Sequence, residues 1–337
     1  MAKRVCIIYT GGTIGMVPSD KGYIPARHRF EDDLAAIADL HKPGMPELEV
    51  IQFDPLLDSS NMAIPEWNAI GRTVAENYHR FDGFVVLHGT DTMSYSASAL
   101  SFMLENLDKS VVFTGAQIPL CELRSDGGSN IVSAVLIAAE GAVREVCIYF
   151  DGQLLRGCRS TKLSSDRFAA FTSPNFPPLG RVGIKIEYAH PGGAPKVRGA
   201  FAFHPMEQVN VGILKLFPGI QLGLFEPIMT ERLRGVVLET FGAGNIPSSS
   251  SGELIPIIRK AYGNGSLIVV CSQCMQGTVT LGAYETSKAL SDIGAVSGRD
   301  MTTEAAMTKL IFLFSKGMSV EEISREMTRN LCGEITE

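Results

Sequence analysis

The first half of the chain alternates short apolar runs rich in β-branched residues with segments of helical spacing, and this alternation constrains the fold more than any other feature. It predicts a doubly wound α/β domain in which right-handed crossovers join parallel strands. The predicted strands span Val5 to Tyr9, Val50 to Phe53, Gly83 to Leu87, Val111 to Thr114 and Val146 to Phe150. The predicted helices span Phe30 to Leu40, Pro65 to His79, Ser94 to Glu105 and Asn130 to Ala139.

The second half repeats the pattern on a smaller scale after a segment rich in glycine and proline. Strands are predicted near 211–216, 235–239 and 267–271, and helices near 252–261, 303–315 and 320–329. We therefore predict a large N-terminal α/β domain over residues 1–190, a linker over 191–209 and a small C-terminal α/β domain over 210–337.

Composition narrows the possible partners and the compartment. A length of 337 residues suffices for two domains, and a net charge of −6 without a basic run argues against a nucleic-acid partner. No apolar stretch is long enough for a membrane span, and the run behind Lys3 and Arg4 is too short for a signal peptide. The seven cysteines are scattered and odd in number, which does not suggest a disulfide framework. Together these features predict a cytoplasmic protein that makes no membrane contact.

Two threonines stand in glycine-rich loops directly after predicted strands. Thr13 lies in VCIIYTGGTIG and Thr90 in FVVLHGTDTM. A hydroxyl is a poor nucleophile until a base takes its proton, and Asp91 beside Thr90 with Lys162 further along suits acyl transfer. Two alternatives stay open, because the first loop could bind an anion and Asp91 or Thr92 could cap the following helix.

These loops belong to a longer series of motifs. Y-T-G-G-T-I-G and L-H-G-T-D-T-M resemble the two signature motifs of bacterial-type L-asparaginases. D-S-S-N-M, T-G-A-Q-I-P, L-R-S-D-G and F-G-A-G-N fit the same family in the same order. The resemblance covers essentially the whole chain and is strongest to the cytoplasmic type I enzymes. It implies the two-domain asparaginase fold and hydrolysis of L-asparagine with no metal or organic cofactor.

The resemblance also implies catalytic roles. Thr13 would be the nucleophile in preference to Thr90, and Tyr23, in a Gly- and Pro-rich loop that is typical of a lid, would help to deprotonate it. Tyr23 could instead only pack the lid shut. Asp91 would bind the substrate ammonium group, and Lys162 would serve as a base, although an arbitrary lysine is more often solvated.

Substrate binding is expected from a further set of residues. The D-S-S-N-M motif would meet the substrate together with Thr90 and Asp91; its candidate residues are Asp58, Ser59 and Ser60. Ser60 stands where periplasmic relatives commonly carry glutamine. By resemblance a neighbouring subunit contributes Asn245, whereas Pro247 replaces a second asparagine of those relatives. His88, at the end of a buried strand, is expected to be structural.

A site shared between subunits implies a homo-oligomer, and the family suggests a tetramer built as a dimer of intimate dimers. Some type I relatives are also regulated allosterically by asparagine. Three alternatives remain. The protein could be a glutaminase-asparaginase, because the one methylene by which glutamine exceeds asparagine is worth only about 1–3 kcal/mol in selectivity. It could also be the asparaginase-like subunit of a tRNA-dependent amidotransferase, which carries an additional domain before the first motif, or a non-catalytic amino-acid sensor.

Overall fold

The computed structural model describes every residue except 1, 21, 26–29, 190–198, 283–284 and 337. The chain divides into two compact units, Met1–Ser173 with Pro177–Pro205, and Pro174–Phe176 with Met206–Glu337. Residues 191–198 of the predicted linker lie outside the described residues.

The first unit is built around an eight-stranded sheet in the order β13-β12-β9-β8-β7-β5-β1-β4. Strands β4, β1, β5, β7 and β8 are parallel, whereas β9, β12 and β13 are antiparallel to their neighbours. Every residue of β5, β7 and β8 is buried, so these strands are the continuous apolar runs typical of a sheet covered on both faces. The strand bounds are β1 (Arg4–Gly11), β4 (Glu47–Leu57), β5 (Gly83–Leu87), β7 (Ser110–Thr114), β8 (Val146–Phe150), β9 (Gln153–Arg156), β12 (Gly180–Val182) and β13 (Ile186–Tyr188).

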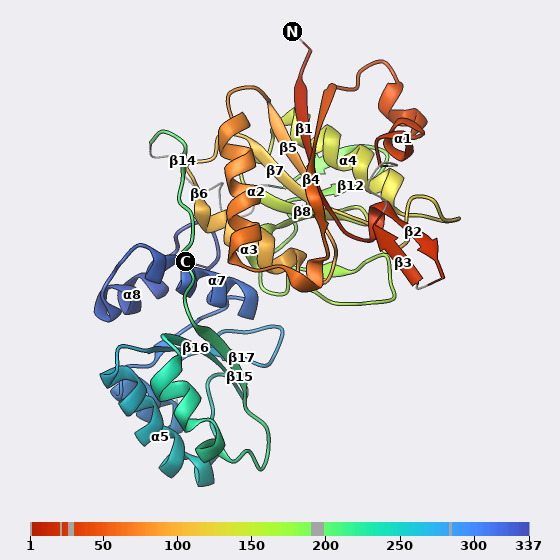
Figure 1. Ribbon diagram of the computed structural model, residues 1–337. Helices are drawn as coiled ribbons and strands as arrows, with labels where there is room; N and C mark the ends of the chain where they lie inside the picture. Colours follow the sequence, from red (N-terminus) through yellow and green to blue (C-terminus); the bar gives the residue numbers. More distant parts are fainter. Residues whose placement is uncertain (1, 21, 26–29, 190–198, 283–284, 337) are drawn as a thin grey trace. The chain divides into compact units, whose positions relative to one another are not determined.

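Helices cover the two faces of this sheet (Figure 1). A Cβ added to Gly83 of β5 would lie 2.2 Å from the carbonyl oxygen of Ala138 in α4. The next residue, Phe84, stacks on Tyr78 at the end of α2. Because successive strand residues point to opposite faces, α4 and α2 lie on opposite faces of the sheet. The helix bounds are α1 (Phe30–Ala35), α2 (Ile64–Asn77), α3 (Met93–Met103) and α4 (Gly127–Glu140).

The crossovers of this sheet do not share one hand. Helix α3 lies beside α2, and Trp67 Nε1 of α2 donates a hydrogen bond of 3.0 Å to Ser96 Oγ of α3. The connections from β4 to β5, β5 to β7 and β7 to β8 all step in the same direction along the sheet. With α4 on the face opposite to α2 and α3, its crossover must have the opposite hand. The expectation of uniformly right-handed crossovers is therefore wrong, whereas the predicted α/β class is confirmed.

Short elements fill the loops of the first unit. Strands β2 and β3 form one hairpin, β10 and β11 a second, and β6 pairs with β14. Their bounds are β2 (Met16–Ser19), β3 (Gly22–Pro25), β6 (Leu104–Glu105), β10 (Thr161–Lys162), β11 (Phe171–Thr172) and β14 (Ala202–Phe203). The 3₁₀ helices are η1 (Thr13–Gly15), η2 (Ala38–His41), η3 (Ser59–Asn61) and η4 (Gly157–Arg159).

The second unit contains a parallel four-stranded sheet in the order β15-β16-β17-β18. Its core joins apolar residues of β16 and β17 to α5, among them Leu238, Val270 and Ile258. The strands are β15 (Val211–Lys215), β16 (Gly235–Thr240), β17 (Leu267–Ser272) and β18 (Val296–Ser297). The helices are α5 (Ser248–Gly263), α6 (Glu285–Asp292), α7 (Thr303–Ser315), α8 (Val320–Met327), the 3₁₀ helix η5 (Leu222–Leu224) and the π-helix η6 (Ile228–Arg232).

A buried ion pair ties the C-terminal segment to this unit. Lys309 Nζ of α7 lies 2.6 Å from Glu334 Oε1, and both side chains are fully buried. Lys309 also donates to the carbonyl oxygens of Met327 and Arg329. Burial opposes the charge of Glu334, but the Lys309 ammonium group outweighs it, so the pKa of Glu334 is lowered.

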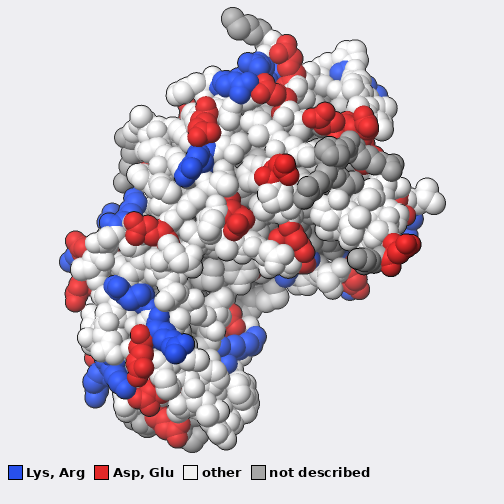
Figure 2. Space-filling model, in the orientation of Figure 1, with Lys and Arg blue, Asp and Glu red and all other residues white. Residues whose placement is uncertain are grey.

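The charged surface is mixed in sign. Figure 2 shows acidic and basic side chains interspersed over the face in view. None of the helices formed by the described residues has both the length and the apolar character needed to cross a lipid bilayer.

Candidate active site

Four neighbouring parallel strands, β4, β1, β5 and β7, end at the same edge of the large sheet. The segments that follow them carry Ser59, Thr13, Thr90 and Gln117. Strands β4 and β5 lie on either side of β1 although they are joined in sequence through α2, which makes β1 a topological switch point. Crevices at such points are the usual ligand sites of open α/β sheets.

The two glycine-rich loops touch through their backbones. Gly12 has a φ of 88°, and a Cβ added there would lie 2.4 Å from the backbone nitrogen of Gly89. A Cβ added to Gly89 would lie 2.4 Å from Ser59 Oγ. Only glycine fits at Gly12, and this close approach places the Thr13 and Thr90 loops side by side.

Thr90, Asp91 and Lys162 form a hydrogen-bonded cluster in the second loop. Lys162 Nζ, carried by β10, lies 2.9 Å from Thr90 Oγ1 and 2.7 Å from Asp91 Oδ1. The Lys162 side chain is 19% exposed, whereas that of Asp91 is 68% exposed. The structure therefore excludes the alternative of a freely solvated Lys162, and it leaves Asp91 open to a ligand.

A chain of buried side chains supports the second loop from behind. Trp67 Nε1 donates to Ser96 Oγ, Ser96 donates to His88 Nε2 at 2.8 Å, and His88 Nδ1 donates to the carbonyl oxygen of Gly89 at 2.6 Å. Burial lowers the pKa of His88 from 6.5 to about 4, so its ring is neutral at pH 7. This arrangement agrees with the structural role expected for His88.

The hydroxyl of Thr13 makes no hydrogen bond with any residue that the structure describes. Its side chain is partly buried in η1, whose turn is closed by a 3.3 Å bond from the backbone nitrogen of Gly15 to the carbonyl oxygen of Gly12. The backbone is thus fixed while the hydroxyl remains available to a ligand.

Tyr23 is not hydrogen-bonded to Thr13. The predicted lid is the β2–β3 hairpin, and Tyr23 on β3 is 51% exposed. Partial desolvation and a hydrogen bond with the Glu122 carboxylate raise the pKa of the Tyr23 phenol. A raised pKa favours the neutral phenol, so in this arrangement Tyr23 is not prepared to act as a base toward Thr13.

The D-S-S-N-M motif forms η3 at the end of β4. Asp58 caps η3 by accepting the backbone N–H of Ser60 at 3.0 Å, and Ser59 is buried while Ser60 is exposed. Thr92 Oγ1 donates to the carbonyl oxygen of Ser59 at 2.7 Å, and no side chain caps α3. Thr92 is the N-cap residue of α3, as one alternative expected, but neither Thr92 nor Asp91 makes a capping side-chain bond, because Thr92 Oγ1 is bonded to Ser59 and Asp91 Oδ1 to Lys162.

Asn245 belongs to the second unit, where it closes the turn after β16. Its backbone nitrogen donates to the carbonyl oxygen of Phe241 at 2.8 Å, and its carbonyl oxygen accepts the Phe241 N–H at 3.0 Å. A contact between Asn245 and the substrate remains a proposal.

Gln117 is a site residue to which sequence reasoning assigns no role. Its Oε1 accepts a 3.1 Å hydrogen bond from Thr90 Oγ1, so it extends the Lys162–Thr90 cluster by one residue. A sequence signal could have identified it, because Gln117 follows β7 closely, just as Thr13 follows β1 and Thr90 follows β5.

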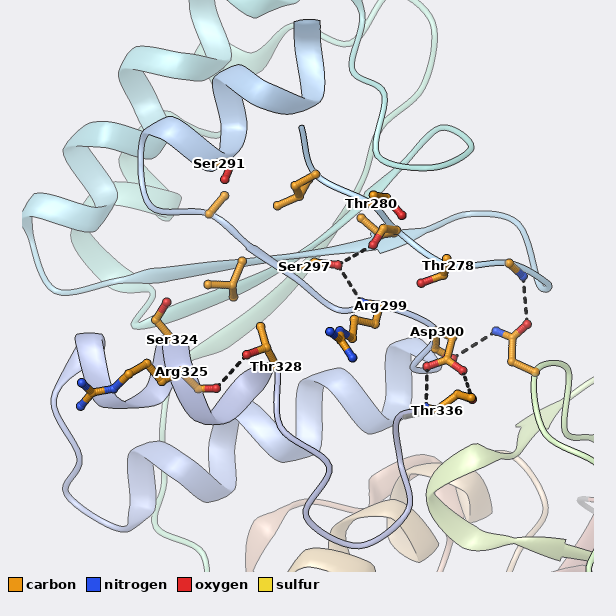
Figure 3. A pocket seen from close by; sticks show the side chains of 16 residues that line it. Thr278, Thr280, Ser291, Ser297, Arg299, Asp300, Ser324, Arg325, Thr328 and Thr336 are labelled. Carbon is orange, nitrogen blue, oxygen red and sulfur yellow. Dashed lines mark hydrogen bonds between the residues drawn. The ribbon is translucent and has the colours of Figure 1, made fainter. Parts of the chain in front are cut away.

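Two other features bear on where the chemistry lies. Among the described residues no three His, Cys, Asp or Glu side chains are grouped so that they could hold a metal ion. A cavity of about 980 Å³ lies in the second unit, where Figure 3 shows Thr280, Ser297, Arg299 and Thr328 around it. None of the predicted catalytic residues lines this cavity, so we place the candidate active site at the strand edge of the first unit.

Family models match almost the whole chain. "Asparaginase, N-terminal" matches residues 4–192, and "Glutaminase/Asparaginase C-terminal domain" matches residues 210–327. The chain belongs to the asparaginase family.

Individual asparaginases agree with this assignment. L-asparaginase 1 of Escherichia coli K12 is 42% identical over 334 residues, which cover 99% of this chain and 98% of that protein. The crystal structure of L-asparaginase I from Vibrio cholerae has a TM-score of 0.92 at 42% identity and covers 100% of both chains. The thermostable L-asparaginase from Thermococcus kodakarensis has a TM-score of 0.89 at 31% identity and covers 99% of both chains.

Proposed function

We propose that this protein hydrolyses the side-chain amide of L-asparagine to give L-aspartate and ammonia. The observation that carries the proposal is the cluster of Lys162, Thr90 and Asp91 beside the unengaged hydroxyl of Thr13 in a member of the asparaginase family. A base, a relaying hydroxyl, a carboxylate and a nucleophile are the groups that acyl transfer from an amino-acid amide requires.

In the proposed mechanism, the Thr13 hydroxyl attacks the amide carbon of asparagine. Its proton passes toward Lys162 through Thr90, and the tetrahedral intermediate expels the amide nitrogen as ammonia once that nitrogen has been protonated. Water then attacks the aspartyl ester, which releases aspartate and restores the Thr13 hydroxyl. Asp91, which is largely exposed, would bind the substrate ammonium group.

Ammonia release from asparagine and from glutamine, measured side by side with the purified protein, tests the proposal. We expect faster turnover of asparagine, with full activity after exhaustive dialysis against EDTA. Higher kcat/KM for glutamine would identify a glutaminase-asparaginase, and the absence of turnover with either amide would favour an amino-acid sensor.

The identity of the nucleophile needs a separate experiment. Thr13→Ala should abolish turnover and Thr13→Ser should retain part of it, because serine keeps the hydroxyl. Trapping of an aspartyl ester in rapidly quenched reactions should locate the acyl group on Thr13. An ester on Thr90 would reverse the assignment of the two threonines.

We further propose a cytoplasmic homotetramer, assembled as two intimate dimers in which Asn245 reaches the site of a neighbouring protomer. The seven cysteines are scattered and odd in number, which supports a reducing compartment. Sedimentation should detect the tetramer, and a fully active monomer would contradict it.

Cooperative activation by asparagine is the corresponding regulatory proposal, and a hyperbolic rate curve at a fixed oligomeric state would contradict that.

A further inference from the structure

We propose that Gln117 is a positioning residue whose side-chain oxygen accepts the hydrogen bond of the Thr90 hydroxyl when Lys162 is charged. This inference rests on the proposed function, because it assigns Gln117 a part in the proton relay of that site. It concerns the direction of hydrogen bonds within the cluster rather than a further contact with substrate.

The orientation of the Gln117 carboxamide is fixed by its two partners. Gln117 Nε2 donates to the carbonyl oxygen of Arg167 at 3.1 Å. A carbonyl oxygen can only accept, so the amide nitrogen must face Arg167 and Oε1 must face Thr90. The oxygen of Gln117 is therefore a pure acceptor at 3.1 Å from the Thr90 hydroxyl.

The backbone of Gln117 is anchored equally firmly. The Asp126 carboxylate accepts the N–H of Gln117 at 3.0 and 3.1 Å and the N–H of Ile118 at 3.0 Å. Asn130 Nδ2 holds the same carboxylate at 3.2 Å. The L-R-S-D-G motif thus acts on the active-site edge through Asp126, which fixes the loop that presents Gln117.

The direction of the Thr90 proton follows from these contacts. When Lys162 is an ammonium group, it donates to Thr90 Oγ1 at 2.9 Å and cannot accept. The single Thr90 proton then goes to Gln117 Oε1. When Lys162 is neutral, the Thr90 proton can turn toward its nitrogen, which is the direction that base catalysis requires.

This alternation gives Gln117 its function in the relay. As the attacking hydroxyl gives its proton to Thr90, Thr90 passes its former proton to Lys162. Lys162 is then charged, and the new Thr90 proton finds its acceptor on Gln117. Without that acceptor, the state in which Lys162 is charged would leave the buried Thr90 hydroxyl with no acceptor for its proton, which is unfavourable.

Two variants of similar side-chain length test the proposal in opposite directions. Gln117→Met removes the acceptor and should lower kcat about 10- to 100-fold, with less than about a threefold change in KM. It should also move the acid limb of the kcat pH profile to lower pH, because the charged form of the cluster is disfavoured. Gln117→Glu keeps an accepting oxygen and adds negative charge, so it should retain more kcat and move that limb to higher pH.

Other groups near the cluster are the same in both variants. The ionisable side chains on the adjoining segments include Asp91, Cys121, Glu122, Arg124, Asp126, Asp166 and Arg167. The matched control is Ser125→Ala, since Ser125 Oγ bonds the Ile118 carbonyl at 2.9 Å within the same loop but not the Gln117 side chain. This control should lower thermal stability slightly without moving the pH profile.

The outcomes separate this inference from the proposed function. Opposite shifts of the acid limb in the two variants support the role of Gln117. Unchanged kcat and pH profiles in both variants overturn it, as does an equal shift in Ser125→Ala. Absence of asparagine hydrolysis by the unaltered protein would instead refute the proposed function itself.

Discussion

Lys162 and Lys309 are each paired with a carboxylate, but the surroundings of the two ion pairs differ. Lys162 in the first unit binds one hydroxyl and one carboxylate, and the Asp91 side chain is 68% exposed. Lys309 in the second unit binds Glu334 and two backbone carbonyl oxygens, and both members of the pair are 0% exposed.

The difference lies in how many of the lysine donors are already used. An ammonium group has three N–H bonds, and Lys309 has an acceptor for each of them. Lys162 has acceptors for two among the described residues, which leaves one N–H for a ligand or a proton partner. A saturated and buried cation stabilises structure, whereas an unsaturated cation at a strand edge can take part in chemistry.

Replacement of Lys162 should produce the largest effect on activity. Lys162→Met is expected to lower kcat by about 10²–10⁴-fold, the usual contribution of a general base. Its effect on the free energy of unfolding should stay within about 1 kcal/mol, because the ion pair with Asp91 is partly exposed. Ammonia release and chemical denaturation measure the two quantities. A variant that unfolds readily but keeps its turnover per folded molecule would break the comparison.

Lys309→Met should show the reverse pattern. It leaves Glu334 buried without its partner and should lower the free energy of unfolding by about 3–5 kcal/mol. Turnover per folded molecule should not change. The double variant Lys309→Met/Glu334→Gln should recover part of the lost stability, because no unpaired charge remains. Equal stability of the single and double variants would show that the unpaired Glu334 charge is not the cause of the loss.

His88 sharpens the comparison, since it is buried and polar but neutral. Its pKa falls from 6.5 to about 4 in the folded state, so the unfolded chain binds more protons between these pH values. Stability should therefore rise with pH over this window and be lost as pH falls through it, by at most about 3 kcal/mol from this group. His88→Gln should flatten the pH dependence of urea unfolding between pH 6.5 and 4. An unchanged slope would show that other groups dominate acid unfolding.

The sequence predicts those parts of the site that follow from local pattern. Apolar runs that end in glycines located β1 and β5, and with them Thr13 and Thr90. The predicted helix over 303–315 coincides with α7, Thr303–Ser315, where Thr302 caps a long apolar segment. Such features depend on neighbouring residues and are visible without tertiary contacts.

Features that depend on contacts between distant segments could not be predicted from the sequence. The hand of the α4 crossover depends on which face of the sheet the helix covers, which no local pattern encodes. Gln117 gains its place from Asp126 and Arg167. The influence of Glu122 on the pKa of Tyr23 acts between segments that are far apart in the sequence. The partners of Lys309 belong to segments that follow α7, so the sequence of α7 alone does not predict that the Lys309 side chain is buried.

Asp58 should give the smallest effect, and it tests whether a carboxylate at the site edge is structural or binds substrate. It accepts the Ser60 N–H through Oδ1 as the cap of η3, so one of its two carboxylate oxygens already has a structural partner. Asp58→Asn keeps a capping oxygen and loses the charge, whereas Asp58→Ala loses both. If Asp58 acts only as a cap, Asp58→Ala should lower stability by about 1 kcal/mol while Asp58→Asn changes it little, and neither should alter KM by much. If its charge also meets the substrate ammonium group, both variants should raise KM for asparagine to a similar extent. We expect the first result, because the cap already engages Asp58 Oδ1, whereas the 68% exposed Asp91 side chain is the proposed partner of the substrate ammonium group.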